Sequence, residues 1–175
     1  MNIKRIKGLL SNFCMYIILL FTSILPNSRY SNKIRGTLLA PFFKKCGRNL
    51  QVASGVTLIN PRNITIGDNV YIAHNTWING TGGLEIESDV IISPMVVIAT
   101  TKHSYIDGKI SNTKSELAPI LIKSGTWIAS NSVITKGVII GKGSIIGACS
   151  AVTREIPDFY FAGGVPAKPL KKLIN

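Results

Sequence analysis

The 175-residue chain contains two histidines, His74 and His103. A neutral imidazole can accept a proton from a hydroxyl group near neutral pH, so each histidine is a candidate general base. His103 ends the run IATTKH, and a regular six-residue pattern breaks off directly after it. On spacing alone, the favoured interpretation of His103 is a surface residue at the end of a structural repeat. The surrounding sequence must decide between these two interpretations.

The three cysteines form no recognisable ligand pattern. Cys14, Cys46 and Cys149 are far apart, and no CxxC motif or Cys/His spacing connects them. A structural zinc site needs four closely spaced ligands, and a secreted disulfide framework normally has an even number of cysteines. The sequence therefore predicts a protein of the reducing cytoplasm that requires no metal.

A six-residue repeat occupies most of the chain. An α-helix cannot present every sixth residue on one face, whereas a solenoid with three flat sides can, with one hexad per side and 18 residues per coil. The sequence therefore predicts an all-β solenoid of about five coils over residues 49–160. Twelve β-branched residues open the hexads and are predicted to point inward: Ile66, Ile72, Ile78, Ile86, Ile92, Ile98, Ile122, Ile128, Ile134, Ile140, Ile146 and Val152.

The repeat is interrupted once, between His103 and Pro119. We expect residues 104–118 to form a loop that protrudes from the coil. A flat solenoid face has no concavity to hold a substrate, and an extruded loop can supply one. The interruption therefore favours a functional site beside His103.

Residues 1–48 have a different composition. Residues 1–67 hold ten of the 20 Lys and Arg residues and none of the eight acids, which predicts an anionic partner. Nucleic acid is not expected, because the bases are not interleaved with aromatic residues. Residues 8–28 carry no charge and have the apolar spacing of a helix, which Pro26 ends. A second short helix is expected over 31–41.

Three interpretations of residues 8–28 remain open. The segment can be a helix that lies on a membrane surface, or packs on this domain or a neighbouring subunit. It is short for a membrane span, which needs about 20 apolar residues. A signal peptide would share the basic start, but no small-x-small cleavage site precedes Pro26.

The repeat region resembles the hexapeptide-repeat acyltransferases, which fold as a left-handed parallel β-helix. The resemblance covers about residues 50–172 and is carried by the runs GTWIASNSVITKGVIIGKGSIIGACSAVT and GGVPAK. The likeness is greatest to the maltose and galactoside O-acetyltransferases and, for the N-terminal helices, to the colanic-acid and capsule group. It implies a homotrimer that binds acetyl-CoA in a groove between neighbouring prisms. It also implies transfer of the acetyl group to a saccharide hydroxyl, in capsule, exopolysaccharide or O-antigen synthesis.

The resemblance also implies roles for individual residues. His103 matches the catalytic histidine, which would take a proton from the acceptor hydroxyl without a covalent intermediate. Ala73 replaces an acceptor-binding asparagine, so His74, Asn75 and Asp107 are the acceptor-site candidates here. The coenzyme-binding candidates implied are Trp127, Ala129, Ser130, Ala148 and Thr153, with Lys168 and Lys171 of the tail 161–175 near the CoA phosphates.

The acceptor would be a saccharide on a lipid carrier, at the inner face of the plasma membrane. Three other functions remain open. A zinc hydratase on the same solenoid needs three histidines, and the chain has two. The other two are an amino-sugar N-acetyltransferase and a non-catalytic scaffold. Measured binding of acetyl-CoA would argue against the scaffold.

Overall fold

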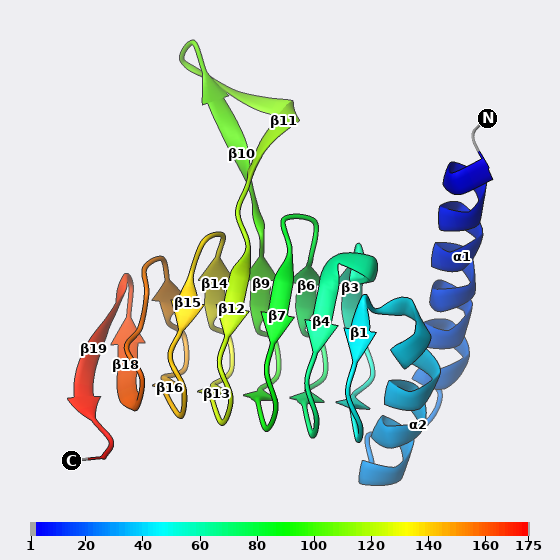
Figure 1. Ribbon diagram of the computed structural model, residues 1–175, viewed down its shortest axis with the longest axis horizontal. Coiled ribbons are helices and arrows are strands. Elements are labelled where there is room, and N and C mark those ends of the chain that lie inside the picture. Colours follow the sequence, from blue (N-terminus) through cyan, green and yellow to red (C-terminus); the bar gives the residue numbers. More distant parts are fainter. Residues whose placement is uncertain (1–2, 175) are drawn as a thin grey trace.

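The computed structural model describes residues 3–174, with side chains from residue 10 onward. Two helices lie at one end of a three-sided parallel β-solenoid, and the C-terminal strands lie at the other (Figure 1). The solenoid has about six turns, one more than the sequence indicated. The additional turn includes residues outside the predicted range 49–160, because sheet formation begins at Lys45 and continues beyond residue 160.

Three sheets form the sides of the solenoid, and we call them A, B and C. Sheet A contains β1 (Lys45–Cys46), β4 (Ile64–Ile66), β7 (Leu84–Ile86), β12 (Ile120–Ile122) and β15 (Ile139–Ile140). Sheet B contains β2 (Gln51–Val52), β5 (Tyr71–Ile72), β8 (Ile91–Ile92), β13 (Trp127–Ile128), β16 (Ile145–Ile146), β18 (Tyr160–Gly164) and β19 (Ala167–Lys172). Sheet C contains β3 (Thr57–Ile59), β6 (Trp77–Asn79), β9 (Val97–Ala99), β14 (Val133–Thr135) and β17 (Ala151–Val152).

The core is the stack of hexad-opening residues, as predicted. All twelve are at most 1% exposed. Successive coils place them in register, so that Ile72 lies beside Ile92 and Ile92 beside Ile128. Stacked β-branched side chains exclude water from the interior, and this burial is the main stabilising term of the fold.

Between the hexads that begin at Ile78 and Ile86, the chain has two additional residues, Leu84 and Glu85. Strands β4, β7 and β12 each have a buried residue at both ends, and Ile64, Leu84 and Ile120 lie in register. The two additional residues are therefore accommodated on one side of the prism, and sheets B and C keep their pattern.

The interruption of the repeat forms a β-hairpin. Strands β10 (Thr101–Ile106) and β11 (Lys109–Leu117) pair antiparallel and project from the end of β9 (Figure 1). The turn is Asp107-Gly108, and both residues have positive φ (48° and 77°). Asp-Gly is a favoured sequence for such two-residue hairpin turns. The predicted protrusion is confirmed, and the extra hydrogen-bonding groups are satisfied by pairing within it.

Two α-helices precede the solenoid, α1 (Ile3–Ser23) and α2 (Arg29–Leu39). A short 3₁₀ helix, η1 (Ala40–Phe42), follows α2, and another, η2 (Pro61–Asn63), precedes β4. Ser28 caps α2, since its Oγ accepts the Ser31 N–H at 3.2 Å. Helix α2 packs closely on the first coil, where a Cβ at Gly36 would collide with the Leu50 carbonyl. No helix among residues 3–174 is long and apolar enough to cross a membrane.

Arg35 of α2 holds the C-terminal end of α1. Its guanidinium is 1% exposed and donates to the carbonyls of Thr22 (3.1 and 3.0 Å) and Leu25 (2.6 Å) and to Asn32 Oδ1 (2.9 Å). A cation at this position is also favoured by the helix dipole. Burial lowers the pKa of Arg35. The loop between the helices is therefore fastened by one side chain.

We expect Arg35→Lys to lower the free energy of unfolding by about 2–3 kcal/mol, because an ammonium group cannot reach all these acceptors and leaves buried carbonyls unpaired. Denaturant unfolding measures the change, and Arg29→Lys on the exposed start of α2 is the matched control. An equal, small effect of both substitutions would contradict this role of Arg35.

Candidate active site

His103 lies on β10, near the base of the hairpin, and its side chain is exposed. Its Nδ1 is 3.0 Å from the carbonyl oxygen of Ser111. A carbonyl only accepts hydrogen bonds, so Nδ1 is the donor, and in the neutral imidazole the lone pair is then on Nε2. The hairpin therefore presents His103 in the tautomer that a general base requires.

An irregularity in β11 brings Ser111 to His103. Tyr105 pairs with Ile110, whereas His103 pairs with Ser115, so extra residues bulge out of β11 between the two pairs. The bulge is closed by Ser111, whose Oγ accepts the backbone N–H groups of Thr113 (3.3 Å) and Lys114 (2.9 Å). Bulges commonly re-aim groups next to active sites. Here the bulge directs a backbone carbonyl at an imidazole.

An ion-pair cluster fixes the base of the hairpin. Glu116 of β11 lies 3.0 Å from Lys136 Nζ of the next coil and 3.8 Å from Lys102 Nζ across the hairpin. The hydrogen bond from Lys136 and the charge of Lys102 lower the pKa of Glu116. A lowered carboxyl pKa means that the cluster persists at neutral pH and is lost only as acid protonates Glu116. Lys136 thus links the hairpin that carries His103 to the solenoid.

A second group of predicted residues lies along one edge of the prism, between sheets B and C. We call this edge, marked by His74, Pro94, Ser130 and Ala148, the B–C edge. The carbonyls of His74, Pro94 and Ser130 each accept an N–H from the next coil; Cys149 N–H, for example, bonds Ser130 O at 3.0 Å. The residue that follows each of these edge residues at the corner has a positive φ, namely Asn75, Met95, Asn131 and Cys149.

The positive φ at this corner is a structural reason for an asparagine at position 75, because asparagine adopts positive φ more readily than most residues. Asn75 is exposed and His74 is half-buried beside it. The structure thus brings His74 and Asn75 onto the same edge as Ser130 and Ala148. Asp107 is elsewhere, at the tip of the hairpin turn.

Trp127 and Ala129 lie next to the B–C edge. Trp127 is 45% exposed on the outer face of sheet B, and its Nε1 donates to Ser93 Oγ at 2.9 Å. Ala129 is buried at the end of β13. The indole is therefore held by a hydrogen bond while much of its surface stays open to a ligand.

Thr153 and the two lysines lie apart from this edge. Thr153 follows β17 and so occupies the other edge of sheet C, from which the hairpin also emerges. Lys168 and Lys171 are exposed on β19, where they pair with Gly163 and Phe161. Ser130, Ala148 and Thr153, expected along one edge, are divided between two.

His103 and the B–C edge are likewise separated within one chain. Ser130 precedes β14, whereas the hairpin follows the last residue of β9, and these strands are parallel neighbours. The two groups thus lie at opposite ends of the sheet C strands. One prism alone does not bring the histidine to Ser130 and Ala148.

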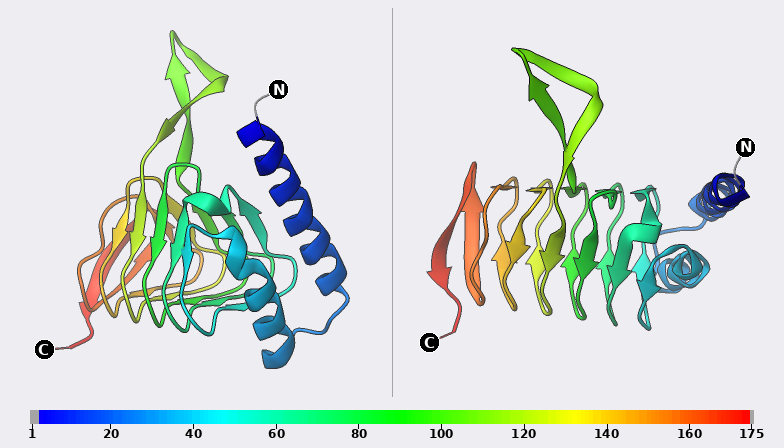
Figure 2. Two further views of the ribbon diagram at one scale, coloured as in Figure 1. Left: turned by 45° about the vertical axis from the view of Figure 1, so that its right-hand side comes forward. Right: turned by 45° about the horizontal axis from the view of Figure 1, so that its top comes forward.

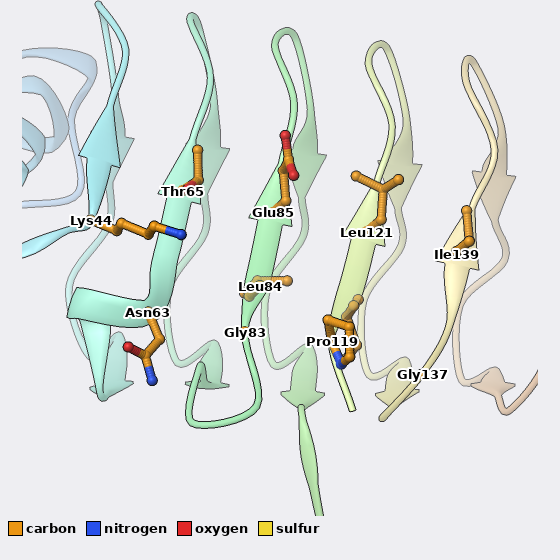
Figure 3. Close-up of a pocket in the computed structure, with 11 residues that line it drawn as sticks. Lys44, Asn63, Thr65, Gly83, Leu84, Glu85, Pro119, Leu121, Gly137 and Ile139 are labelled. Atoms are coloured by element: carbon orange, nitrogen blue, oxygen red, sulfur yellow. The ribbon is translucent and has the colours of Figure 1, made fainter. Parts of the chain in front are cut away.

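A shallow groove of about 470 Å³ lies on the outer face of sheet A, beside the base of the hairpin (Figure 3). Its lining extends from Lys44 at one end, past Glu85 on the central strand β7 and then Pro119 and Leu121, to Ile139 at the other end. None of the predicted site residues lines it. Across residues 3–174, no three His, Cys, Asp or Glu side chains are grouped so that they could hold a metal ion.

The sequence did not reveal the residues that position His103. The Asp-Gly pair signals a hairpin turn, but neither the bulge at Ser111 nor the Glu116–Lys136 pair has a motif. Ser93, which orients Trp127, was missed for the same reason. The Ser93–Trp127 and Glu116–Lys136 contacts join successive coils, and the His103–Ser111 contact joins the two strands of the hairpin.

Comparison with known proteins agrees with the solenoid fold. Residues 119–154 match the model described as bacterial transferase hexapeptide (six repeats). Galactoside O-acetyltransferase of Escherichia coli (strain K12) is 34% identical over 139 residues, 79% of this chain and 68% of that protein. A protein of the same strain, provisionally named colanic acid biosynthesis acetyltransferase WcaF, is 26% identical over 141 residues, 81% of this chain and 76% of its own.

Among solved structures, a hexapeptide-repeat-containing acetyltransferase from Vibrio cholerae O1 biovar eltor, complexed with acetyl coenzyme A, has a TM-score of 0.81 at 26% identity. The match covers 94% of this chain and 88% of that one. The chain therefore belongs to the hexapeptide-repeat transferase family. Within that family it is an acyltransferase.

Proposed function

We propose that this protein transfers the acetyl group of acetyl-CoA to a hydroxyl of a saccharide, with His103 as general base. The observation that carries the proposal is the 3.0 Å contact between His103 Nδ1 and the Ser111 carbonyl, which leaves Nε2 free to accept a proton. The donor is inferred from the acetyl-CoA complex of the Vibrio cholerae relative, and the acceptor class from the galactoside enzyme.

In the proposed reaction, Nε2 takes the proton of the acceptor hydroxyl as its oxygen attacks the thioester carbonyl. The carbon–sulfur bond then breaks, and CoA leaves as a thiol after accepting the proton from the imidazolium. The Ser111 carbonyl stabilises that imidazolium through its Nδ1–H. Acetyl transfer is direct, with no covalent intermediate on the protein.

The proposed active unit is a homotrimer with the site between neighbouring prisms. His103 of one chain would face the B–C edge of the next chain, where small side chains at Ala129, Ser130 and Ala148 leave room for the pantetheine arm. This arrangement explains why one chain separates these groups. Trp127 would flank the arm, Thr153 would approach it from the histidine's side, and Lys168 and Lys171 would meet the CoA phosphates.

The proposed acceptor is a saccharide assembled on a lipid carrier for a surface polysaccharide, at the cytoplasmic face of the membrane. Support for the polysaccharide comes from the WcaF relative. His74 and Asn75 are proposed to contact the acceptor, since Ala73 cannot hydrogen bond through its side chain. Asp107 is proposed to reach it from the hairpin tip.

The proposal is tested by calorimetric titration of acetyl-CoA into the purified protein, which needs no knowledge of the acceptor. We expect micromolar binding, about one site per chain, weakened about tenfold or more in Lys168→Ala/Lys171→Ala because two charge contacts are lost. Lys109→Ala/Lys114→Ala on the hairpin is the matched control. A folded protein that binds no acetyl-CoA would favour the scaffold interpretation.

A further inference from the structure

Helix α1 exposes a continuous apolar strip. Leu10, Phe13, Leu20 and Phe21 are spaced so that they fall on one side of the helix, and Ile24 follows directly after its last residue. These five residues are 61%, 61%, 66%, 67% and 83% exposed. Large apolar side chains gathered in this way on a soluble surface mark an interaction site.

The opposite side of α1 already has its packing partners. Met15 and Thr22 are buried, and Ile18 and Leu19 pack partly against the core. Helix α1 is therefore apolar on two sides, and only one of them is needed to attach it to α2 and the first coil. The exposed strip has no partner within the described chain.

Basic residues precede and follow this strip in the sequence. Arg29 and Lys33 lie at the start of α2, around Tyr30, which is 81% exposed. In the sequence, Lys4, Arg5 and Lys7 precede the strip, and residues 1–67 contain no acid. Contact of two such surfaces would bring like charges together, so the charge pattern favours an anionic partner over a second copy of the chain.

The helices are also placed suitably for a flat partner. Both run across the end of the solenoid, perpendicular to its long axis, and in Figure 2 (right) they are seen nearly end-on beyond the first coil. Helix α1 is the outermost element at that end, and β18 and β19 are at the other. A planar surface can therefore meet the strip without contacting most of the prism.

We propose that α1 docks on an anionic lipid bilayer, lying in the plane of the interface with Leu10, Phe13, Leu20, Phe21 and Ile24 inserted among the acyl chains. Arg29 and Lys33 contact the headgroups. An apolar strip flanked in sequence by bases is the composition of interfacial helices. The solenoid then stands upright on the membrane. This inference does not depend on acetyl transfer.

The test is flotation of the full-length protein with vesicles of phosphatidylcholine alone and with phosphatidylglycerol added. We expect binding to the anionic vesicles to exceed binding to neutral ones by about tenfold or more. Leu20→Ser/Phe21→Ser should reduce binding by about tenfold or more, and Arg29→Gln/Lys33→Gln should reduce it and weaken its salt dependence.

Matched controls lie at the other end of the solenoid. Val165→Ser/Leu170→Ser removes two exposed apolar side chains and Lys142→Gln/Arg154→Gln removes two charges, and both should bind vesicles like the parent protein. Sedimentation of each variant reports its oligomeric state. Absence of vesicle binding by the parent, or loss of oligomers rather than of vesicle binding in Leu20→Ser/Phe21→Ser, would overturn the proposal. Acetyl-CoA titration of the same samples shows separately whether the proposed function holds.

Discussion

His103→Ala is expected to lower the turnover number for acetyl transfer by about 10²–10⁴-fold, the usual contribution of a general base. The affinity for acetyl-CoA should stay within about twofold, because the imidazole is proposed to act on the acceptor hydroxyl. Initial rates with a saccharide acceptor give the first quantity and calorimetry gives the second.

The matched control for this substitution is Lys109→Ala, which removes an exposed side chain from the same hairpin and should retain the parent rate. Circular dichroism checks that both variants keep the solenoid. A loss of less than about tenfold in His103→Ala would contradict the base assignment. In that case the contact with the Ser111 carbonyl would be a structural feature of the bulge.

Two inactive variants should restore activity when they assemble together. In Ser130→Trp the B–C edge is blocked, and in His103→Ala the base is missing. In trimers assembled at random from equal amounts, about one interface in four pairs an intact His103 with an intact edge, so the mixture should regain about a quarter of the parent rate. Co-expression with two affinity tags yields the mixed trimers for assay.

The control mixture combines Ser130→Trp with Ala148→Trp. Both substitutions block the same edge, so no pairing of these chains creates an intact site, and the activity should stay near zero. If the His103→Ala mixture is no more active than its parents, although mixed trimers are isolated, then the site is built within one chain. The separation of His103 from the B–C edge within one chain would then need another explanation.

The sequence by itself determined the core and the architecture. Each inward position is a local choice of a β-branched residue, and repetition every six residues leaves a three-sided solenoid as the way to bury them together. The position of the protrusion followed directly from the break in that pattern. The helical nature of residues 8–28 followed from their spacing, although the sequence left open what their exposed side contacts.

Only the tertiary structure decided how the chemical groups are arranged. The His103 tautomer depends on a carbonyl eight residues away, brought near by a bulge that has no motif. The separation of His103 from Ser130 depends on the pairing of β9 with β14, because the hairpin follows the end of one strand and Ser130 precedes the start of the other. Likewise, the exposed strip on α1 becomes visible only when Met15 and Thr22 are seen to be buried on its other side. Such contacts join residues that the folded chain brings together, and a pattern read along the sequence reports only what is repeated along it.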